Sequence, residues 1–205
     1  MTLTDQSTGI REGEELDAAQ IDPYLKAHIP GLTGTPRISQ FPGGASNLTY
    51  LLEYPEQEFV LRRPPFGHKA KSAHDMGREY RILNQLNAGF PYCPKAYVHC
   101  TDESVIGAEF YVMQRVKGII LRSDMPAELN FSAEQTKALC KSFIDKLVDL
   151  HNVDYQACGL ADLGKPEGYV KRQIEGWSDR YEKALTPDAP VWEQVKAWLR
   201  EKMPA

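Results

Sequence analysis

The chain has 205 residues, of which 42% are hydrophobic and 25% are charged, and its formal net charge is -4 at pH 7. This length suits one large domain or two small lobes, and this composition is typical of a globular protein that buries a core. The negative charge excludes a protein that holds nucleic acid by attraction to phosphates, and no apolar run approaches the roughly 20 residues that span a bilayer. We therefore expect neither nucleic acid nor a membrane among the partners.

The N-terminal region begins with a polar segment. Residues 1–15 carry both signs of charge and lack the apolar core of a signal peptide, so we expect a flexible tail and a cytoplasmic protein. A first helix is predicted over residues 18–28 with Asp17 as its N-cap. Pro23 leaves open a later start of this helix, with Asp22 as the cap.

Strand patterns follow this helix. Leu48–Leu52 and Phe59–Arg62 are rich in apolar and aromatic residues, and the turn at 54–58 separates them. This pattern predicts an antiparallel meander. Two further strands are predicted at Ala96–Cys100 and Glu109–Val116.

Between the two strand pairs lies one predicted helix. Ser72 and Asp75 form an S-x-x-D start signal, the helix runs to about Asn87, and Gly89 provides a stop.

After Gly118 the apolar residues recur only at helical spacing. Helices are predicted at 133–151, which begins with a capping box of Ser132 and Gln135, at 167–184 and at 191–202. Strands with one helix therefore come first and helices second. This order predicts an α+β fold with two lobes, an N-lobe at 16–117 and the start of a helical C-lobe at 118–205.

A glycine-rich run is the first feature that carries chemistry. Gly43, Gly44, Ala45, Ser46 and Asn47 lie between strand patterns. Two glycines let the backbone approach a ligand closely, and successive amide groups in such a turn can hold phosphate oxygens. The same residues are also typical of a simple hairpin turn, and locally both interpretations stay open.

Arg62 and Glu79 are the second feature. The neighbours of Arg62 and Arg63 are apolar on both strand faces, so one of these arginines is expected to point inward. Glu79 precedes apolar residues three, four and seven positions further along its helix, which places its carboxylate beside the buried stripe. Because a buried charge is costly unless it is paired, we predict an Arg62–Glu79 ion pair, with exposed surface charges as the alternative.

The third feature is the strand at 110–118, which runs into a glycine at the lobe junction. A strand edge offers alternating backbone donors and acceptors that suit a flat heterocycle, and Met113 is placed to flank it. A plain core strand that ends in a turn fits the same residues.

Taken in order, these segments resemble the aminoglycoside phosphotransferase family, which shares the fold of protein kinases. The resemblance is closest to the branch related to the N-terminal part of acyl-CoA dehydrogenase fusion proteins. It covers the chain from about residue 29 onward, and the residues that carry it are 41–52, 59–65, 78–83 and 110–118, with weaker support at 150–151 and 168–177.

The resemblance implies a role for each feature. Gly43 to Asn47 would form the loop over the ATP phosphates, and Arg62 would stand where kinases usually place a phosphate-binding lysine, with Glu79 as its partner. Met113 would be the gatekeeper, and backbone groups of Gln114 and Val116 would hold the adenine. The arginine departs from the wider kinase pattern.

Phosphoryl transfer also needs an acceptor-positioning carboxylate and two metal ligands, which the family supplies from a His-Gly-Asp motif with a following Asn and from a later Asp. None of the five histidines of the chain begins a His-Gly-Asp motif; the nearest match is His151-Asn152-Val153-Asp154. The four cysteines also lack metal-ligand spacing. We therefore expect no catalytic and no metal-binding residue in this chain.

Two explanations of this lack stay open. The chain is expected to be the N-terminal part of a longer ATP-dependent phosphotransferase, inactive alone, with magnesium and a small-molecule hydroxyl acceptor bound only by the full-length form. The alternative is a short regulatory module, similar to a pseudokinase, that binds a nucleotide without transfer.

Overall fold

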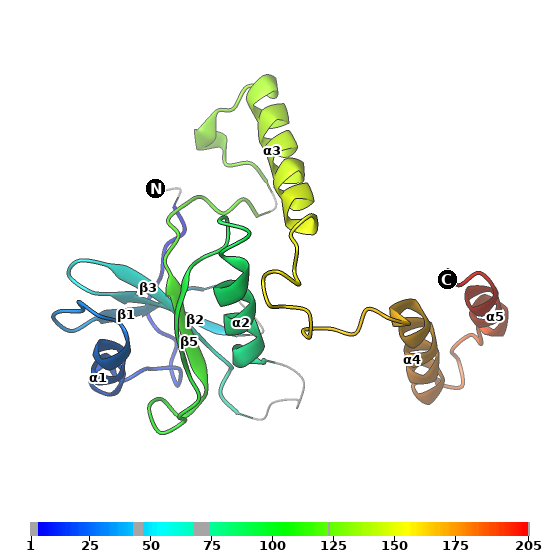
Figure 1. The fold of residues 1–205 in the computed structure, drawn as a ribbon, viewed down its shortest axis with the longest axis horizontal. Helices are drawn as coiled ribbons and strands as arrows, with labels where there is room; N and C mark the ends of the chain where they lie inside the picture. The colour runs from blue at the N-terminus through cyan, green and yellow to red at the C-terminus, as the bar shows by residue number, and fades with distance from the viewer. Residues whose placement is uncertain (1–3, 43–46, 68–73, 123, 205) are drawn as a thin grey trace. The chain divides into compact units, whose positions relative to one another are not determined.

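The computed structural model describes residues 4–42, 47–67, 74–122 and 124–204. The chain divides into two compact units, Met1–Leu160 and Ala161–Ala205, each of which is described by itself. The elements are α1 (Ala18–His28), β1 (Arg37–Gln40), β2 (Leu48–Glu53), β3 (Glu58–Arg63), α2 (Met76–Leu86), β4 (Ala96–Cys100), β5 (Phe110–Gln114), the 3-10 turn η1 (Ala127–Leu129), α3 (Ala133–His151), α4 (Tyr169–Lys183) and α5 (Glu193–Glu201), and Figure 1 labels most of them. Among the helices of the described residues, none combines the length and apolar character that a membrane span requires.

A five-stranded sheet is the centre of the first unit. Its strand order is β1-β2-β3-β5-β4, and every neighbouring pair is antiparallel. The predicted meander of the first strands is confirmed. The last pair inserts β5 between β3 and β4, so β5 is a central strand with neighbours on both sides.

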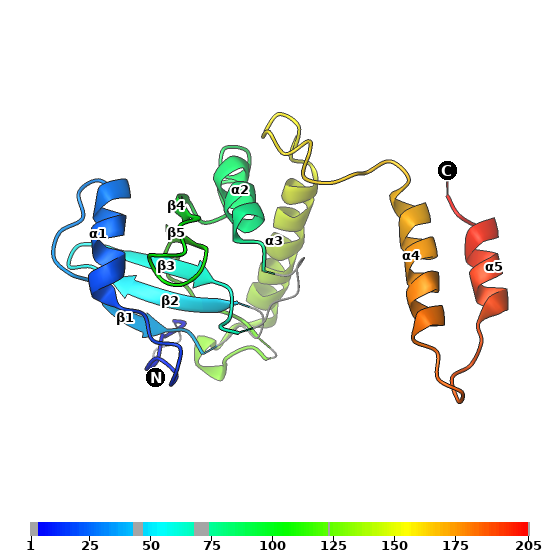
Figure 2. The same cartoon turned by 90° about the horizontal axis from the view of Figure 1, so that it is seen from below.

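Helices α1 and α2 pack on opposite faces of the sheet, and the strands lie between them in Figures 1 and 2. Against α1 lies the main core, in which Ile21, Leu25 and Ile29 contact alternate residues of the strands, such as Tyr50 and Leu61. Their spacing of four residues places these three side chains on one helix face. Helix α2 packs against β4 and β5.

Helix α1 begins at the earlier of the two predicted positions. Asp17 is the N-cap, and its side chain accepts a 2.8 Å hydrogen bond from the backbone nitrogen of Ala19. Pro23 lies inside the helix and removes one backbone donor. The burial of Ile21 explains the early start, because a helix that began at Pro23 would not place Ile21 on the core face.

Helix α2 begins at Met76, because Asp75 caps it with a 2.8 Å hydrogen bond from the backbone nitrogen of Arg78. The predicted start signal at Ser72 lies outside the described residues. The C-cap is Asn87, two residues before the predicted stop at Gly89.

The later helices occur where the periodicity predicts them. Ser132 and Gln135 form the predicted capping box of α3. Helices α4 and α5 are slightly shorter than predicted, beginning at Tyr169 and Glu193.

The segment expected as a flexible tail makes ordered contacts in its described part. Thr8 and Gln40 exchange backbone hydrogen bonds of 2.7 and 3.1 Å as an isolated antiparallel bridge. The phenol of Tyr50 donates a 2.8 Å hydrogen bond to the carbonyl of Glu14. The backbone of Gln40 and the hydroxyl of Tyr50 thus bind a segment whose own composition gives no sign of order.

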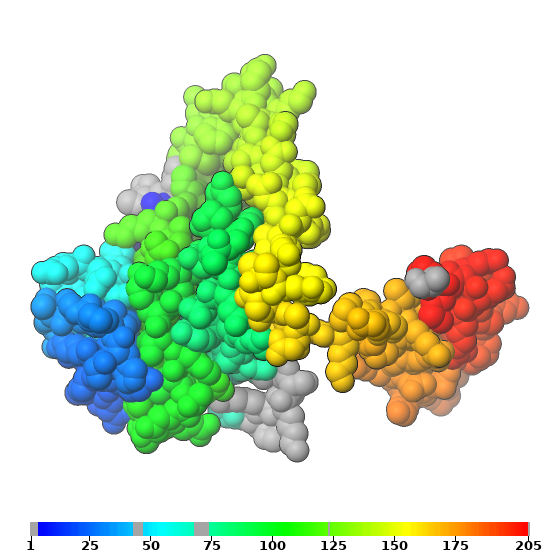
Figure 3. Space-filling view, in the orientation of Figure 1, coloured from blue at the N-terminus to red at the C-terminus, as the bar shows by residue number. Residues whose placement is uncertain are grey.

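The compact first unit extends beyond the predicted lobe junction at residue 118. The loop that follows α3 packs against α2, as the yellow and green segments of Figure 3 show, and Arg81 Nη2 donates a 2.9 Å hydrogen bond to the carbonyl of Gly159. Lys146 of α3 also lies over the ring of Tyr92, 4.4 Å from its centroid. The functional division into an N-lobe and a C-lobe stays a prediction.

Candidate functional site

The candidate site lies on the sheet face that carries α2. In the strand register Arg62 of β3 is opposite Thr49 of β2 and Tyr111 of β5, and Val60 is opposite Leu51 and Met113. Since side chains alternate across a strand, these residues share one face. Arg63 points to the other face and is buried there, so the structure selects Arg62 for the candidate site.

The predicted ion pair between Arg62 and Glu79 is present. Arg62 Nε lies 3.4 Å from Glu79 Oε2, and the two side chains are 32% and 30% exposed. Arg62 Nε is buried and has no hydrogen-bond partner among the described residues. The pair is therefore an electrostatic contact without a well-formed hydrogen bond, and the guanidinium has donor capacity for a ligand.

Two further residues bind the Glu79 carboxylate. Asn47 Nδ2 donates a hydrogen bond of 2.9 Å to Oε1, and the Tyr111 hydroxyl donates one of 2.9 Å to Oε2. Burial, the largest cause, raises the pKa of Tyr111 well above its ordinary value; the nearby Arg62 charge lowers it, and the Glu79 charge and hydrogen bond raise it. The phenol therefore stays protonated and donates at neutral pH.

Asn47 connects this carboxylate to the segment before α2. Its side-chain oxygen lies 2.7 Å from His74 Nδ1. Because the Asn47 amide nitrogen faces a carboxylate, its oxygen must face His74, and the hydrogen-bond network assigns a proton to Nδ1. His74 has a φ of 65°, which is uncommon for a residue other than glycine.

The rest of the predicted glycine loop cannot be compared. Gly43, Gly44, Ala45 and Ser46 lie outside the described residues, so their role over the phosphates stays a prediction. Asn47, at the end of the loop, is 5% exposed and lies at the candidate site.

A cavity of about 370 Å³ is lined by four of the predicted site residues, namely Arg62, Met113, Gln114 and Val116. A second cavity of about 320 Å³ contains Glu79 and shares Arg62, Pro94 and Met113 with the first. The structure therefore brings the six described site residues, including Asn47, to one region of the sheet.

Sequence reasoning missed several residues of the first cavity, which are Asp5, Phe41, Thr49, Val60, Pro94, Arg115, Ile120 and Arg122. The guanidinium of Arg115 lies over the ring of Phe41, 4.8 Å from its centroid. The alternation along β2 and β3 would have placed Thr49 and Val60 on the Arg62 face. No local signal identifies Asp5, which reaches the cavity through tertiary contacts.

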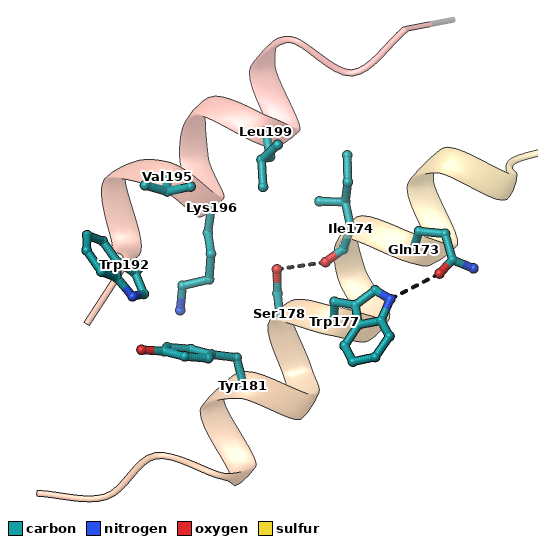
Figure 4. A pocket seen from close by; sticks show the side chains of 9 residues that line it. All are labelled: Gln173, Ile174, Trp177, Ser178, Tyr181, Trp192, Val195, Lys196 and Leu199. Atoms are coloured by element: carbon teal, nitrogen blue, oxygen red, sulfur yellow. Dashed lines mark hydrogen bonds between the residues drawn. The ribbon is translucent and has the colours of Figure 1, made fainter. Parts of the chain in front are cut away.

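The second unit has its own cavity, between α4 and α5. Its volume is about 620 Å³, and Figure 4 shows the side chains that line it, which are Gln173, Ile174, Trp177, Ser178, Tyr181, Trp192, Val195, Lys196 and Leu199. The walls are mostly apolar, and Lys196 Nζ pairs with the carboxylates of Glu182 and Glu193. This cavity contains none of the predicted site residues.

Nowhere in the described ranges do three or more His, Cys, Asp or Glu side chains come together as a metal site requires. We assign no residue of this chain to magnesium.

The antiparallel sheet, its α2 helix and the arginine–glutamate pair define a protein of the kinase-like α+β fold class. The chain belongs to the phosphotransferase enzyme family, APH, whose family model matches residues 37–205. This agrees with the resemblance seen in the sequence.

Curated relatives support the same assignment. The chain is 32% identical over 210 residues to acyl-CoA dehydrogenase family member 11 of Rattus norvegicus, covering 100% of this chain and 26% of the relative. It is 34% identical over 196 residues to the Homo sapiens protein of the same name, covering 93% of this chain and 25% of the relative. The chain thus spans about a quarter of the length of these relatives.

Two solved structures resemble this one. A protein from Ralstonia eutropha, assigned as an aminoglycoside phosphotransferase, superposes with a TM-score of 0.78 at 33% identity, over 93% of this chain and 54% of that chain. Macrolide 2'-phosphotransferase type I superposes with a TM-score of 0.51 at 15% identity, over 95% of this chain and 60% of that chain, and supports the fold alone.

Proposed function

We propose that this chain binds the ATP of a phosphotransfer reaction in which the γ-phosphate passes to a hydroxyl of a small molecule. The observation that carries the proposal is the position of Arg62, which lines both cavities of the candidate site and lies 3.4 Å from Glu79. A guanidinium that is held by a carboxylate on one side and open to a cavity on the other is suited to phosphate oxygens.

In the proposed complex the cavity beside Arg62 receives the adenosine. Val60 and Met113 offer apolar surface to the base. The N–H of Gln114 already donates to the carbonyl of Lys95 at 2.8 Å, and the carbonyl of Val116 accepts from Arg115 at 3.2 Å. The adenine contacts would therefore use the carbonyl of Gln114 and the N–H of Val116.

We also propose that these 205 residues do not transfer the phosphate by themselves. The sequence contains no His-Gly-Asp motif, and we assign no residue to the acceptor or to magnesium. Longer members of the family would supply these groups. The same absence favours, as a second candidate, a module that binds nucleotide without transfer.

Titration calorimetry with ATP tests the binding proposal. We expect the unchanged chain to bind ATP and Arg62→Ala to lower the affinity by about tenfold or more, because charge-assisted contacts to phosphate are lost. The loss should be large for ATP and small for adenosine. Arg37→Ala is the matched control, since Arg37 is 77% exposed on the edge strand β1 and outside the Arg62 cavity.

Three results would contradict these proposals. Absence of ATP binding by the unchanged chain would exclude a nucleotide site. An equal loss for ATP and adenosine in Arg62→Ala would exclude the phosphate role of Arg62. Phosphate transfer to a hydroxyl acceptor by the purified chain would contradict the proposed inactivity.

A further inference from the structure

The N-terminal segment brings a carboxylate to the candidate nucleotide cavity. This segment lies outside residues 37–205, the part of the chain that the family model matches. It is held at the sheet edge by the Thr8–Gln40 bridge and by a 2.9 Å hydrogen bond from the backbone nitrogen of Arg11 to Gln40 Oε1. These contacts place the first described residues next to the segment that follows β5.

Asp5 is fixed there by its backbone. Its N–H donates a 3.1 Å hydrogen bond to the carbonyl of Gly118, and its carbonyl accepts a 2.6 Å hydrogen bond from Arg115 Nη2. Neither contact uses the side chain. A substitution of the Asp5 side chain therefore leaves both attachments available.

The Asp5 carboxylate lies at the edge of the cavity. Asp5 is one of the lining residues, its side chain is 18% exposed, and Oδ1 lies 3.3 Å from Nη2 of Arg122, which also lines the cavity. Arg122 is largely exposed, so this ion pair is weak and its carboxylate can exchange partners.

The charges of the cavity suggest what this carboxylate recognises. Asp5 is the one acidic residue among the described lining residues, whereas Arg62, Arg115 and Arg122 are basic. Phosphate oxygens would be repelled by a carboxylate and attracted by Arg62, so the phosphates would lie on the Arg62 side. Asp5, which is bound to Gly118 four residues beyond Gln114, would then face the sugar.

A carboxylate has only acceptor sites, and two neighbouring hydroxyl groups can donate to it together. Carboxylates bind ribose hydroxyls in this way in dinucleotide-binding folds. We infer that Asp5 recognises the 2'- and 3'-hydroxyls of the bound nucleotide and makes the site selective for ribonucleotides over deoxyribonucleotides. This inference rests on the proposed function.

The test compares the affinities for ATP and 2'-deoxyATP by titration calorimetry of the full 205-residue chain. We expect the unchanged chain to prefer ATP by about tenfold, as expected for a hydrogen bond to a charged group. Asp5→Ala should remove this preference: it should lower the ATP affinity by more than the 2'-deoxyATP affinity, because 2'-deoxyATP retains only the 3'-hydroxyl as a donor to the carboxylate. Asp5→Asn, which keeps the shape and one acceptor, should give an intermediate preference.

Glu12→Gln is the matched control, because Glu12 is an exposed acid of the same segment and is absent from the cavity. Its nucleotide preference should equal that of the unchanged chain. Thermal unfolding of each variant separates a loss of fold from a loss of recognition.

The outcomes distinguish the two proposals. If the unchanged chain binds neither nucleotide, the proposed function fails and the inference fails with it. If the unchanged chain binds ATP, three results for Asp5→Ala would overturn only the role of Asp5. These are an unchanged preference for ATP over 2'-deoxyATP, an equal loss of affinity for both nucleotides, and tighter binding of ATP.

Discussion

The hydroxyl of Tyr111 donates its 2.9 Å hydrogen bond to Glu79 Oε2, the same oxygen that lies 3.4 Å from Arg62 Nε. Tyr111 and Arg62 are also direct partners in the β3–β5 register. The strand pairing therefore places a neutral donor and a cation side by side against one carboxylate. This arrangement fixes Glu79 without using all the donors of Arg62.

Replacement of Tyr111 by phenylalanine tests this arrangement. We expect Tyr111→Phe to lower the free energy of unfolding by about 1.5–3 kcal/mol, since a part-buried hydrogen bond to a charged group is lost. The ATP affinity should fall less than in Arg62→Ala, because the guanidinium remains. Urea unfolding and calorimetry measure the two effects.

Tyr169→Phe is a suitable control, because Tyr169 is exposed in the second unit. Unchanged stability of Tyr111→Phe would show that the Tyr111–Glu79 hydrogen bond does not contribute to the fold.

The Asn47 side chain carries the second prediction. Asn47→Ala should cost about 1–3 kcal/mol of unfolding free energy, because it leaves the half-buried Glu79 carboxylate and the His74 ring without this partner. A double-mutant cycle with His74→Ala should show a coupling of about 0.5 kcal/mol or more. Strictly additive effects would mean that the 2.7 Å contact between the two side chains contributes nothing.

The N-terminal segment should respond to acid through Glu14. Hydrogen bonding from Gln40, the largest cause, and the adjacent Arg11 lower the pKa of Glu14 below its ordinary value of 4.5. A group with a lowered pKa in the folded state stabilises the fold above its unfolded pKa, and this contribution disappears as the pH falls through the folded value.

We therefore expect Glu14→Gln to be less stable than the unchanged chain at pH 7, by less than about 1 kcal/mol. The difference should shrink as the pH falls below 4.5. Urea unfolding over this pH range measures it, with Glu12→Gln as the control. A difference that stays constant with pH would exclude a contribution from Glu14 ionisation.

The exposed face of α3 leads to the fourth prediction. Phe143, Ile144 and Val148 are large apolar residues at the surface of this helix, and Phe143 is 68% exposed. Contiguous apolar surface promotes association. Phe143→Asp should therefore reduce concentration-dependent self-association in sedimentation velocity without a loss of helix.

Lys137→Gln is the control for this experiment, because it makes the same change in charge at an exposed position of α3. Equal self-association of the unchanged chain and Phe143→Asp would show that this face of α3 does not mediate the association.

The sequence predicted the parts of the site that depend on local patterns. Alternation along β3 and helical spacing in α2 were enough to propose Arg62 and Glu79 as a pair, because a buried charge needs a partner. Asn47 followed from its place after the glycines. The position of each residue follows from the pattern of its own element or of its neighbours in sequence.

The missed residues depend on pairing between distant segments. Tyr111 reaches Glu79 only because β5 inserts beside β3, and no periodicity within residues 110–118 reveals that neighbour. Asp5 reaches Arg115 and Arg122 across more than a hundred residues of sequence. His74 contacts Asn47 from a conformation that side chains other than glycine rarely adopt.

All three tryptophans of the chain lie in or next to the two helices of the second unit: Trp177 in α4, Trp192 directly before α5 and Trp198 in α5. Each of them is more than half exposed. The first unit, with the proposed nucleotide site, has tyrosines and no tryptophan. Selective excitation of tryptophan fluorescence is therefore a natural optical probe of residues 161–205 alone, and it follows the unfolding of this unit without an added label.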